Sequence, residues 1–81
     1  MRPLPADVAE RVARESYGRL LAYLAAHWRD LALCEDALGD AFASALTIWT
    51  LEGIPVRPEA WLLTIARRRI IDRMRHARMA A

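Results

Sequence analysis

Apolar residues recur at intervals of three and four along most of the 81-residue chain, the spacing of one face of an α-helix. Within residues 31–51 this set is Cys34, Leu38, Ala41, Phe42, Ala45 and Trp49. Within residues 58–78 it is Leu63, Ala66, Ile70, Met74 and Ala77. The sequence has neither the alternating pattern of a half-buried strand nor a β-hairpin turn. We therefore predict an all-α fold, a compact bundle of three to four helices.

Two features of the N-terminal third predict how the first helix begins and bends. Asp7 is followed three residues later by Glu10, a variant of the capping box that marks helix starts. The stretch Ser16-Tyr17-Gly18 predicts a weakened or kinked point in this helix, because Gly in a helix interior lowers helix stability by about 1 kcal/mol relative to Ala. We expect one helix with a kink near Ser16–Gly18, or two shorter helices.

The boundaries of the remaining helices follow from capping and breaking residues. Asp30 is a candidate N-cap for a helix from about Leu31 to Leu51. Gly53 and Pro55 then break the helix within a loop that spans residues 52–57. Pro58 suits the first turn of the last helix, where its missing N–H costs nothing.

The helix predicted at 31–51 has a second face, which is small and acidic. This acidic face is made of Asp36, Gly39, Asp40, Ala43 and Thr47. A flat surface of Gly and Ala lets a partner helix approach closely, and carboxylates can pair with its Arg or Lys. Alternatively, Glu35 and Asp36 merely favour the helix dipole. That alternative leaves unexplained why no cation on this helix compensates the acidic face.

The last predicted helix carries a line of arginines about a quarter-turn away from its apolar stripe. This basic face is made of Trp61, Thr64, Arg67, Arg68, Ile71, Arg75 and Arg78. Guanidinium groups can hold phosphates bidentately, and Thr64 and Ile71 suit base edges. Trp61 is either a stacking plane for a base or a core residue. We expect Arg69 and Arg73, on the other side of the stripe, to pair with acidic residues of the first helices or to extend along the surface.

Charge is distributed unevenly between the two parts of the chain. Residues 1–56 hold five Arg and eight acidic residues, a net charge of −3, whereas residues 57–81 hold seven Arg and two acidic residues, a net charge of +5. This asymmetry predicts two different partners, one basic and one polyanionic. The alternative is solvated surface charge without a partner.

Several classes of protein fit the sequence poorly. No apolar run approaches the roughly 18–20 residues of a membrane span. The single cysteine, Cys34, rules out an internal disulfide, and no Cys/His spacing suits a metal. His27 and His76 do not belong to a constellation of nucleophile and carboxylate that could act in catalysis, and no Gly-rich phosphate loop is present. We expect a cytoplasmic protein without membrane association that is no enzyme and needs no metal or cofactor.

Two motifs in this order resemble region 2 of bacterial sigma factors, most closely the extracytoplasmic-function (ECF) group. They are EDALGDAFASAL at 35–46, followed by Trp49 and the Gly/Pro loop, and AWLLTIARRRIID at 60–72. The resemblance covers roughly residues 15–78. It implies one all-helical region 2 domain over residues 1–81, which binds core RNA polymerase and recognises and melts the promoter −10 element.

The resemblance also implies roles for individual residues. Those predicted to dock on the clamp helices of the polymerase β′ subunit are Glu35, Asp36, Gly39, Asp40, Ala43 and Ser44. The loop residues Gly53, Ile54, Pro55, Val56 and Arg57 match the segment that captures a flipped non-template base. Positions that meet the non-template strand match Trp61, Thr64, Arg68 and Ile71, and Arg67 and Arg75 of the basic face complete the predicted DNA-binding set.

The chain departs from the ECF pattern at three positions. Gly39 stands where Gln is usual, Arg68 where Asn is common, and Thr50 where Pro often follows the tryptophan. These changes affect the expected clamp contact and base preference rather than the fold. They also leave the −10 sequence undetermined.

Other interpretations remain open on the sequence alone. A complete ECF factor has a C-terminal region 4, absent from these 81 residues, so the chain is either an excised domain or a protein that has lost its second half. A free-standing helical DNA-binding regulator would also have a basic last helix. A sigma-like interaction module, such as a decoy or a surface for an anti-sigma factor, would use the acidic face without the arginines.

Overall fold

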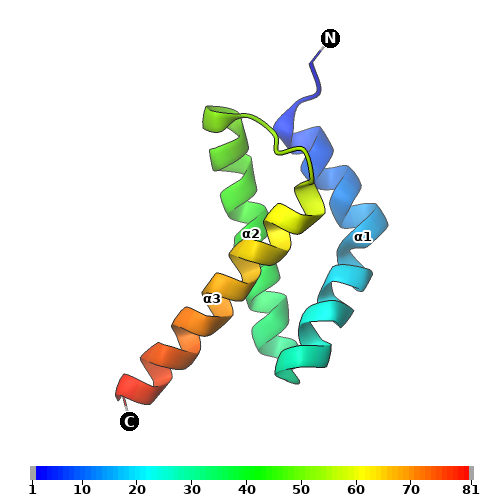
Figure 1. The fold of residues 1–81 in the computed structure, drawn as a ribbon. Coiled ribbons are helices and arrows are strands. Elements are labelled where there is room, and N and C mark those ends of the chain that lie inside the picture. Colours follow the sequence, from blue (N-terminus) through cyan, green and yellow to red (C-terminus); the bar gives the residue numbers. More distant parts are fainter. Residues whose placement is uncertain (1, 81) are drawn as a thin grey trace.

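The computed structural model describes residues 2–80 and consists of three helices, with no strand in that range (Figure 1). They are α1 (Pro5–Trp28), α2 (Leu31–Glu52) and α3 (Pro58–Ala80). The helices α1 and α2 run antiparallel, and α3 crosses them and packs on both, most extensively on α2 (Figure 1). The predicted all-α bundle is confirmed.

The ends of α2 follow the predicted capping chemistry. The Asp30 carboxylate accepts a hydrogen bond from the Leu33 backbone N–H at 3.1 Å, which satisfies one of the free donors at the helix start. After Glu52 the chain leaves the helix at Gly53, whose φ of 98° favours a residue without a Cβ. The Gly53 N–H still donates to the Trp49 carbonyl at 2.9 Å.

The predicted start of α1 is wrong by three residues. The helix begins at Pro5, with Leu4 as its N-cap and no side-chain capping bond. Pro at the first helical position has no N–H to satisfy and a preset φ, so the helix can begin there without a polar cap. Asp7 lies within the first turn, where its negative charge still favours the helix dipole.

One helix, α1, continues through Ser16–Gly18, so the alternative of two shorter helices is wrong. Two residues directly before Gly18 pack inward: Ser16 is buried, and the centroid of the Tyr17 ring lies 6.2 Å from that of Phe42 on α2. The cost of one Gly, about 1 kcal/mol, is smaller than the stabilisation from burying Leu20 and Leu24 beyond it.

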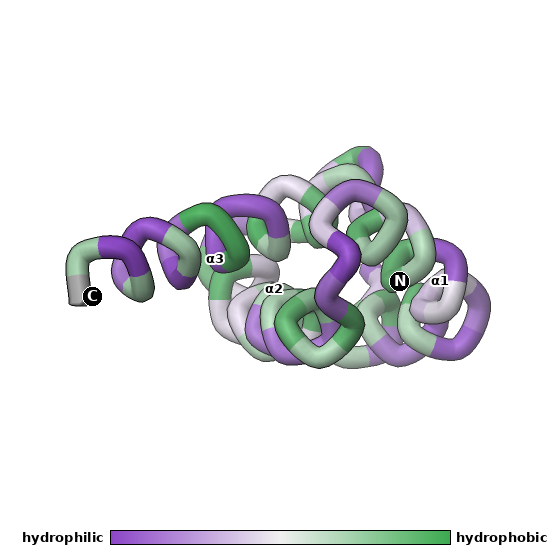
Figure 2. The backbone as a smooth tube through the Cα atoms, turned by 90° about the horizontal axis from the view of Figure 1, so that it is seen from below, coloured by the Kyte–Doolittle hydropathy of each residue, from purple (hydrophilic) through white to green (hydrophobic). Residues whose placement is uncertain are grey.

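The core lies where the three helices cross. Its largest fully buried side chains are Trp49, Leu24, Leu38, Leu62, Ile70 and Cys34. In α3 the stripe predicted from periodicity is partly wrong, because Leu62 rather than Leu63 is fully buried, and Met74 and Ala77 are exposed. The C-terminal part of α3 extends beyond the other two helices (Figure 2), so Met74 and Ala77 have no neighbouring helix to cover them.

Candidate functional site

The acidic face of α2 lies at the surface. Asp36, Gly39, Ala43 and Thr47 are exposed and Asp40 is half-buried. Of the two neighbouring residues implied by the resemblance, Glu35 is exposed and Ser44 half-buried. A Cβ built at Gly39 would meet no atom within 4 Å. The residues predicted to dock on a partner therefore form one accessible surface on one helix.

A cation from α3 lies on this acidic face. Arg73 Nη2 is 2.9 Å from Asp40 Oδ2, and Arg73 Nη1 is 3.5 Å from Asp36 Oδ2. The predicted pairing of Arg73 with acidic residues is confirmed, and the cation that compensates the acidic face comes from α3 rather than from α2 itself. The Asp36 side chain remains 71% exposed, so a partner can still reach its carboxylate.

The loop between α2 and α3 presents some residues to solvent and packs others inward. Val56 is 98% exposed, and Gly53 and Arg57 are also exposed. Ile54 packs against the core, and Pro55 is half-buried. Val56 and Arg57 are therefore accessible to another molecule.

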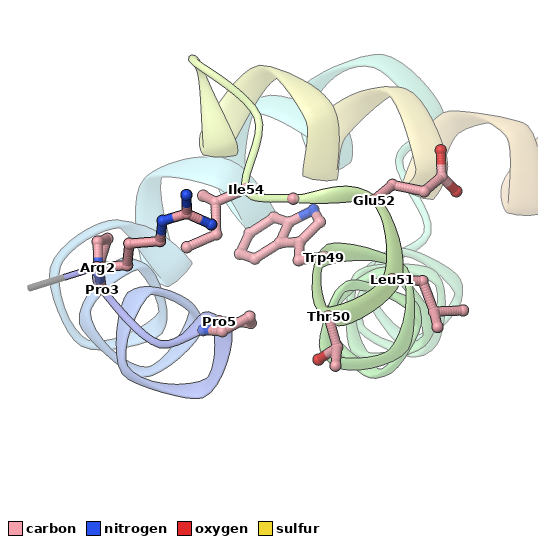
Figure 3. A pocket seen from close by; sticks show the side chains of 9 residues that line it. Arg2, Pro3, Pro5, Trp49, Thr50, Leu51, Glu52 and Ile54 are labelled. Carbon is pink, nitrogen blue, oxygen red and sulfur yellow. The ribbon is translucent and has the colours of Figure 1, made fainter.

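A cavity of about 550 Å³ lies beside this loop. Figure 3 shows the Trp49 ring and Ile54 facing Pro5 across it, with Arg2 and Pro3 on the N-terminal side. From the sequence alone, no role is predicted for the N-terminal residues Arg2 and Pro3. No local pattern could have revealed their place, because it depends on α1 starting beside the end of α2.

Near the loop, Trp49 of α2 packs against Trp61 of α3. Their ring centroids are 5.4 Å apart with the planes at 66°, an edge-to-face arrangement favoured for aromatic pairs. Trp49 is buried, and its indole Nε1 has no hydrogen-bond partner among residues 2–80. Trp61 is half-buried against the core. Part of its ring is therefore structural and part remains accessible.

The rest of the basic face is open to solvent. Thr64, Arg67, Arg68, Ile71, Arg75 and Arg78 are all exposed. The Thr64 hydroxyl donates to the Ala60 carbonyl at 3.0 Å, so it keeps its lone pairs for an outside donor. Within residues 2–80 no acidic group forms an ion pair with Arg67, Arg68 or Arg75. In contrast to Arg73, these guanidinium groups are available to an external anion.

The single thiol of the chain is shielded from solvent. Cys34 is fully buried, and burial raises the pKa of its thiol above the ordinary value, which disfavours the reactive thiolate. Over residues 2–80, no three His, Cys, Asp or Glu side chains come together in a way that could hold a metal ion. None of the helices in that range is long and apolar enough to cross a membrane.

The fold and its two faces define a small helical domain with an acidic surface on one helix and a basic surface on another. The Sigma-70 region 2 family model matches residues 13–79, and the chain belongs to this family. The family is a non-enzymatic transcription factor domain with a role in promoter recognition by RNA polymerase.

One relative is an uncharacterized protein of Rhizobium meliloti (strain 1021), 39% identical over 70 residues. The match covers 85% of this chain but only 16% of the relative. No solved structure matches the chain with statistical significance.

Proposed function

We propose that this chain is the region 2 domain of an ECF-type sigma factor, which binds the β′ clamp helices and recognises and melts the −10 element. The observation that carries the proposal is the separation of charge between helices. Exposed carboxylates lie on α2, and arginines without an internal counter-ion lie on α3. Such a domain acts in the cytoplasm, with an anti-sigma factor as a further candidate partner.

The acidic face supports the protein-binding half of the proposal. Asp36 and Gly39 are exposed side by side with Asp40 on one surface of α2. A small, flat helix surface with carboxylates at its edge fits a helix that presents Arg or Lys. Glu35, Ala43 and Ser44 would then form the edges of the contact.

The basic face and the loop support the DNA-binding half. Arg68 and Arg75 would hold backbone phosphates, while the accessible part of Trp61 would offer a plane for stacking. Val56 at the loop tip would contact a base that has left the stack. No bond is broken in this mechanism, because binding of splayed bases and phosphates offsets the unpairing cost of a few kcal/mol per base.

The decisive experiment is a pull-down of this chain with an isolated β′ clamp-helix fragment, comparing wild type with Asp40→Arg. We expect the wild type to bind and the variant to lose binding, because Asp40→Arg reverses a charge at the centre of the acidic face. Glu15→Arg on α1 makes the same charge change at another exposed position and should bind normally.

Circular dichroism of each variant separates lost binding from lost folding. Asp40 is half-buried and its ion pair is exposed, so its loss should cost at most about 1 kcal/mol. No binding by the wild type, or equal binding by Asp40→Arg, would contradict the proposal. The free-standing DNA-binding regulator would then become the better interpretation.

A further inference from the structure

A cleft of about 360 Å³ lies between the C-terminal end of α1 and the middle of α3. Its lining residues are Tyr23, Ala26, His27, Trp28 and Arg67. The volume lies near the lower end of the range for small-molecule sites, about 300–1,000 Å³. Arg67 belongs to both the cleft and the basic face, so the two surfaces are continuous.

Flat rings make up most of the cleft. The Tyr23 side chain is 60% exposed, and His27 is exposed at the end of α1. The His27 ring lies edge-on to that of Trp28, with centroids 4.5 Å apart and planes at 70°. Trp28 is half-buried and packs against the core. A fixed indole therefore orients His27, and the rings of Tyr23 and His27 remain accessible.

Charge in the cleft favours an anion. Arg67 is the cation in the lining, and no acidic residue contributes to it. Within residues 2–80, no carboxylate forms an ion pair with Arg67. Arg73, on the α2 side of the same helix, is held by two carboxylates. Of these two arginines, Arg67 is the one without an internal counter-ion, so it can bind a phosphate.

We propose that this cleft binds one nucleotide of single-stranded DNA, with the base stacked on Tyr23 and a phosphate held by Arg67. Sites for single strands combine aromatic planes with a basic groove in this way. This inference rests on the proposed function, because melting of the −10 element would supply the single-stranded DNA. It uses different residues from the loop and from Trp61, Thr64, Arg68 and Ile71.

The test measures binding of the 81-residue chain to a fluorescent oligothymidylate and to an abasic strand of equal length, at low salt. Tyr23→Ala should weaken binding of oligothymidylate by about tenfold and leave abasic binding nearly unchanged. Tyr23→Phe keeps the ring and should bind like the wild type. Circular dichroism confirms that each variant is folded.

Two arginine variants supply the charge control. Arg67→Ala should weaken binding of both strands, whereas Arg69→Ala should have a much smaller effect. Both residues are exposed on neighbouring positions of α3, but only Arg67 lines the cleft. Equal losses in the two variants would overturn the proposal, because they would indicate a general charge effect.

Other outcomes separate this inference from the proposed function. If Tyr23→Ala binds like the wild type while Arg68→Ala is impaired, the cleft proposal fails and the basic face stands. If Tyr23→Ala is impaired and Arg68→Ala is not, the cleft stands and the assignment of DNA contact to Arg68 fails. Equal losses of oligothymidylate and abasic binding in Tyr23→Ala would exclude stacking and overturn the cleft proposal.

Discussion

Arg73 of α3 and Asp40 of α2 form an ion pair, with 2.9 Å between Nη2 and Oδ2. The contact joins the helix richest in arginine to the acidic face. Asp36 shares the same guanidinium at 3.5 Å. In the free domain, one arginine thus occupies carboxylates that we propose to bind the polymerase clamp, and its removal tests both the fold and that proposal.

Arg73→Ala should lower the free energy of unfolding by less than about 1 kcal/mol, since both partners are substantially exposed. It should also raise the affinity for the clamp-helix fragment by up to about fivefold, because the acidic face becomes more negative. Urea unfolding and a binding titration measure the two effects.

A double-mutant cycle with Asp40→Ala isolates the contact itself. The coupling free energy of Arg73 and Asp40 should be about 0.2–1 kcal/mol and should decrease at high salt. Weaker clamp binding by Arg73→Ala would contradict the competition that we infer. It would mean that Arg73 supports the acidic face.

The exposed helix-interior glycines should be replaceable without structural cost. A Cβ at Gly18 or Gly39 would meet no atom within 4 Å. Gly18→Ala and Gly39→Ala should each raise the free energy of unfolding by about 0.5–1 kcal/mol, because Ala favours the helix. Thermal unfolding measures this, and a loss of stability in either variant would contradict the open space at that position.

The matched pair also tests the acidic face. Gly39 lies on the proposed clamp contact and Gly18 lies on α1. A larger residue, as in Gly39→Leu, should impair clamp binding, whereas Gly18→Leu should not. Equal binding by both variants would exclude a close approach of the partner at Gly39.

The helix boundaries could be predicted where a single residue determines them. Asp30 caps α2 through its own carboxylate, and Gly53 ends it with a positive φ. Gly18 does not divide α1 into two helices, because the effect of a glycine depends on the packing of the residues around it. The start at Pro5 was missed because Asp7 also fits the first turn.

The site could be predicted only as far as each helix determines it alone. Periodicity places Arg68 and Arg75 on one side of α3, but it cannot tell where the neighbouring helices end, so Met74 was wrongly assigned to the core. The contact between Arg73 and Asp40 and the cleft beside Arg67 depend on how α3 crosses the other helices. No local pattern in the sequence reports that crossing.

Stability should decrease at alkaline pH because of Cys34. Burial is the main cause that raises the pKa of its thiol above the ordinary 9.0. The unfolded chain therefore loses this proton at a lower pH than the folded chain does. The contribution of the Cys34 thiol to stability is complete below about pH 9 and is lost as the pH rises towards the folded-state pKa. The free energy of unfolding falls over that interval by at most about 1.4 kcal/mol per pH unit.

Urea unfolding under reducing conditions at pH 7.5 and pH 10 tests the effect of Cys34. Wild type should lose more stability between the two pH values than Cys34→Ala does. The variant keeps Tyr17 and Tyr23, so the difference between the two proteins isolates the thiol. An identical pH dependence in both proteins would contradict this prediction.

Arg68→Ala should weaken binding of single-stranded DNA and reduce its dependence on salt. Arg68 is exposed, and no ion pair within residues 2–80 involves it, so a phosphate contact would release counterions. The loss of one such contact should lower the slope of log K against log salt by about 0.7. Arg69→Ala removes the same charge from the other side of α3 and should leave the slope nearly unchanged. A wild-type slope in Arg68→Ala would show that this residue does not bind a phosphate, and the DNA contact would then have to lie elsewhere on the domain.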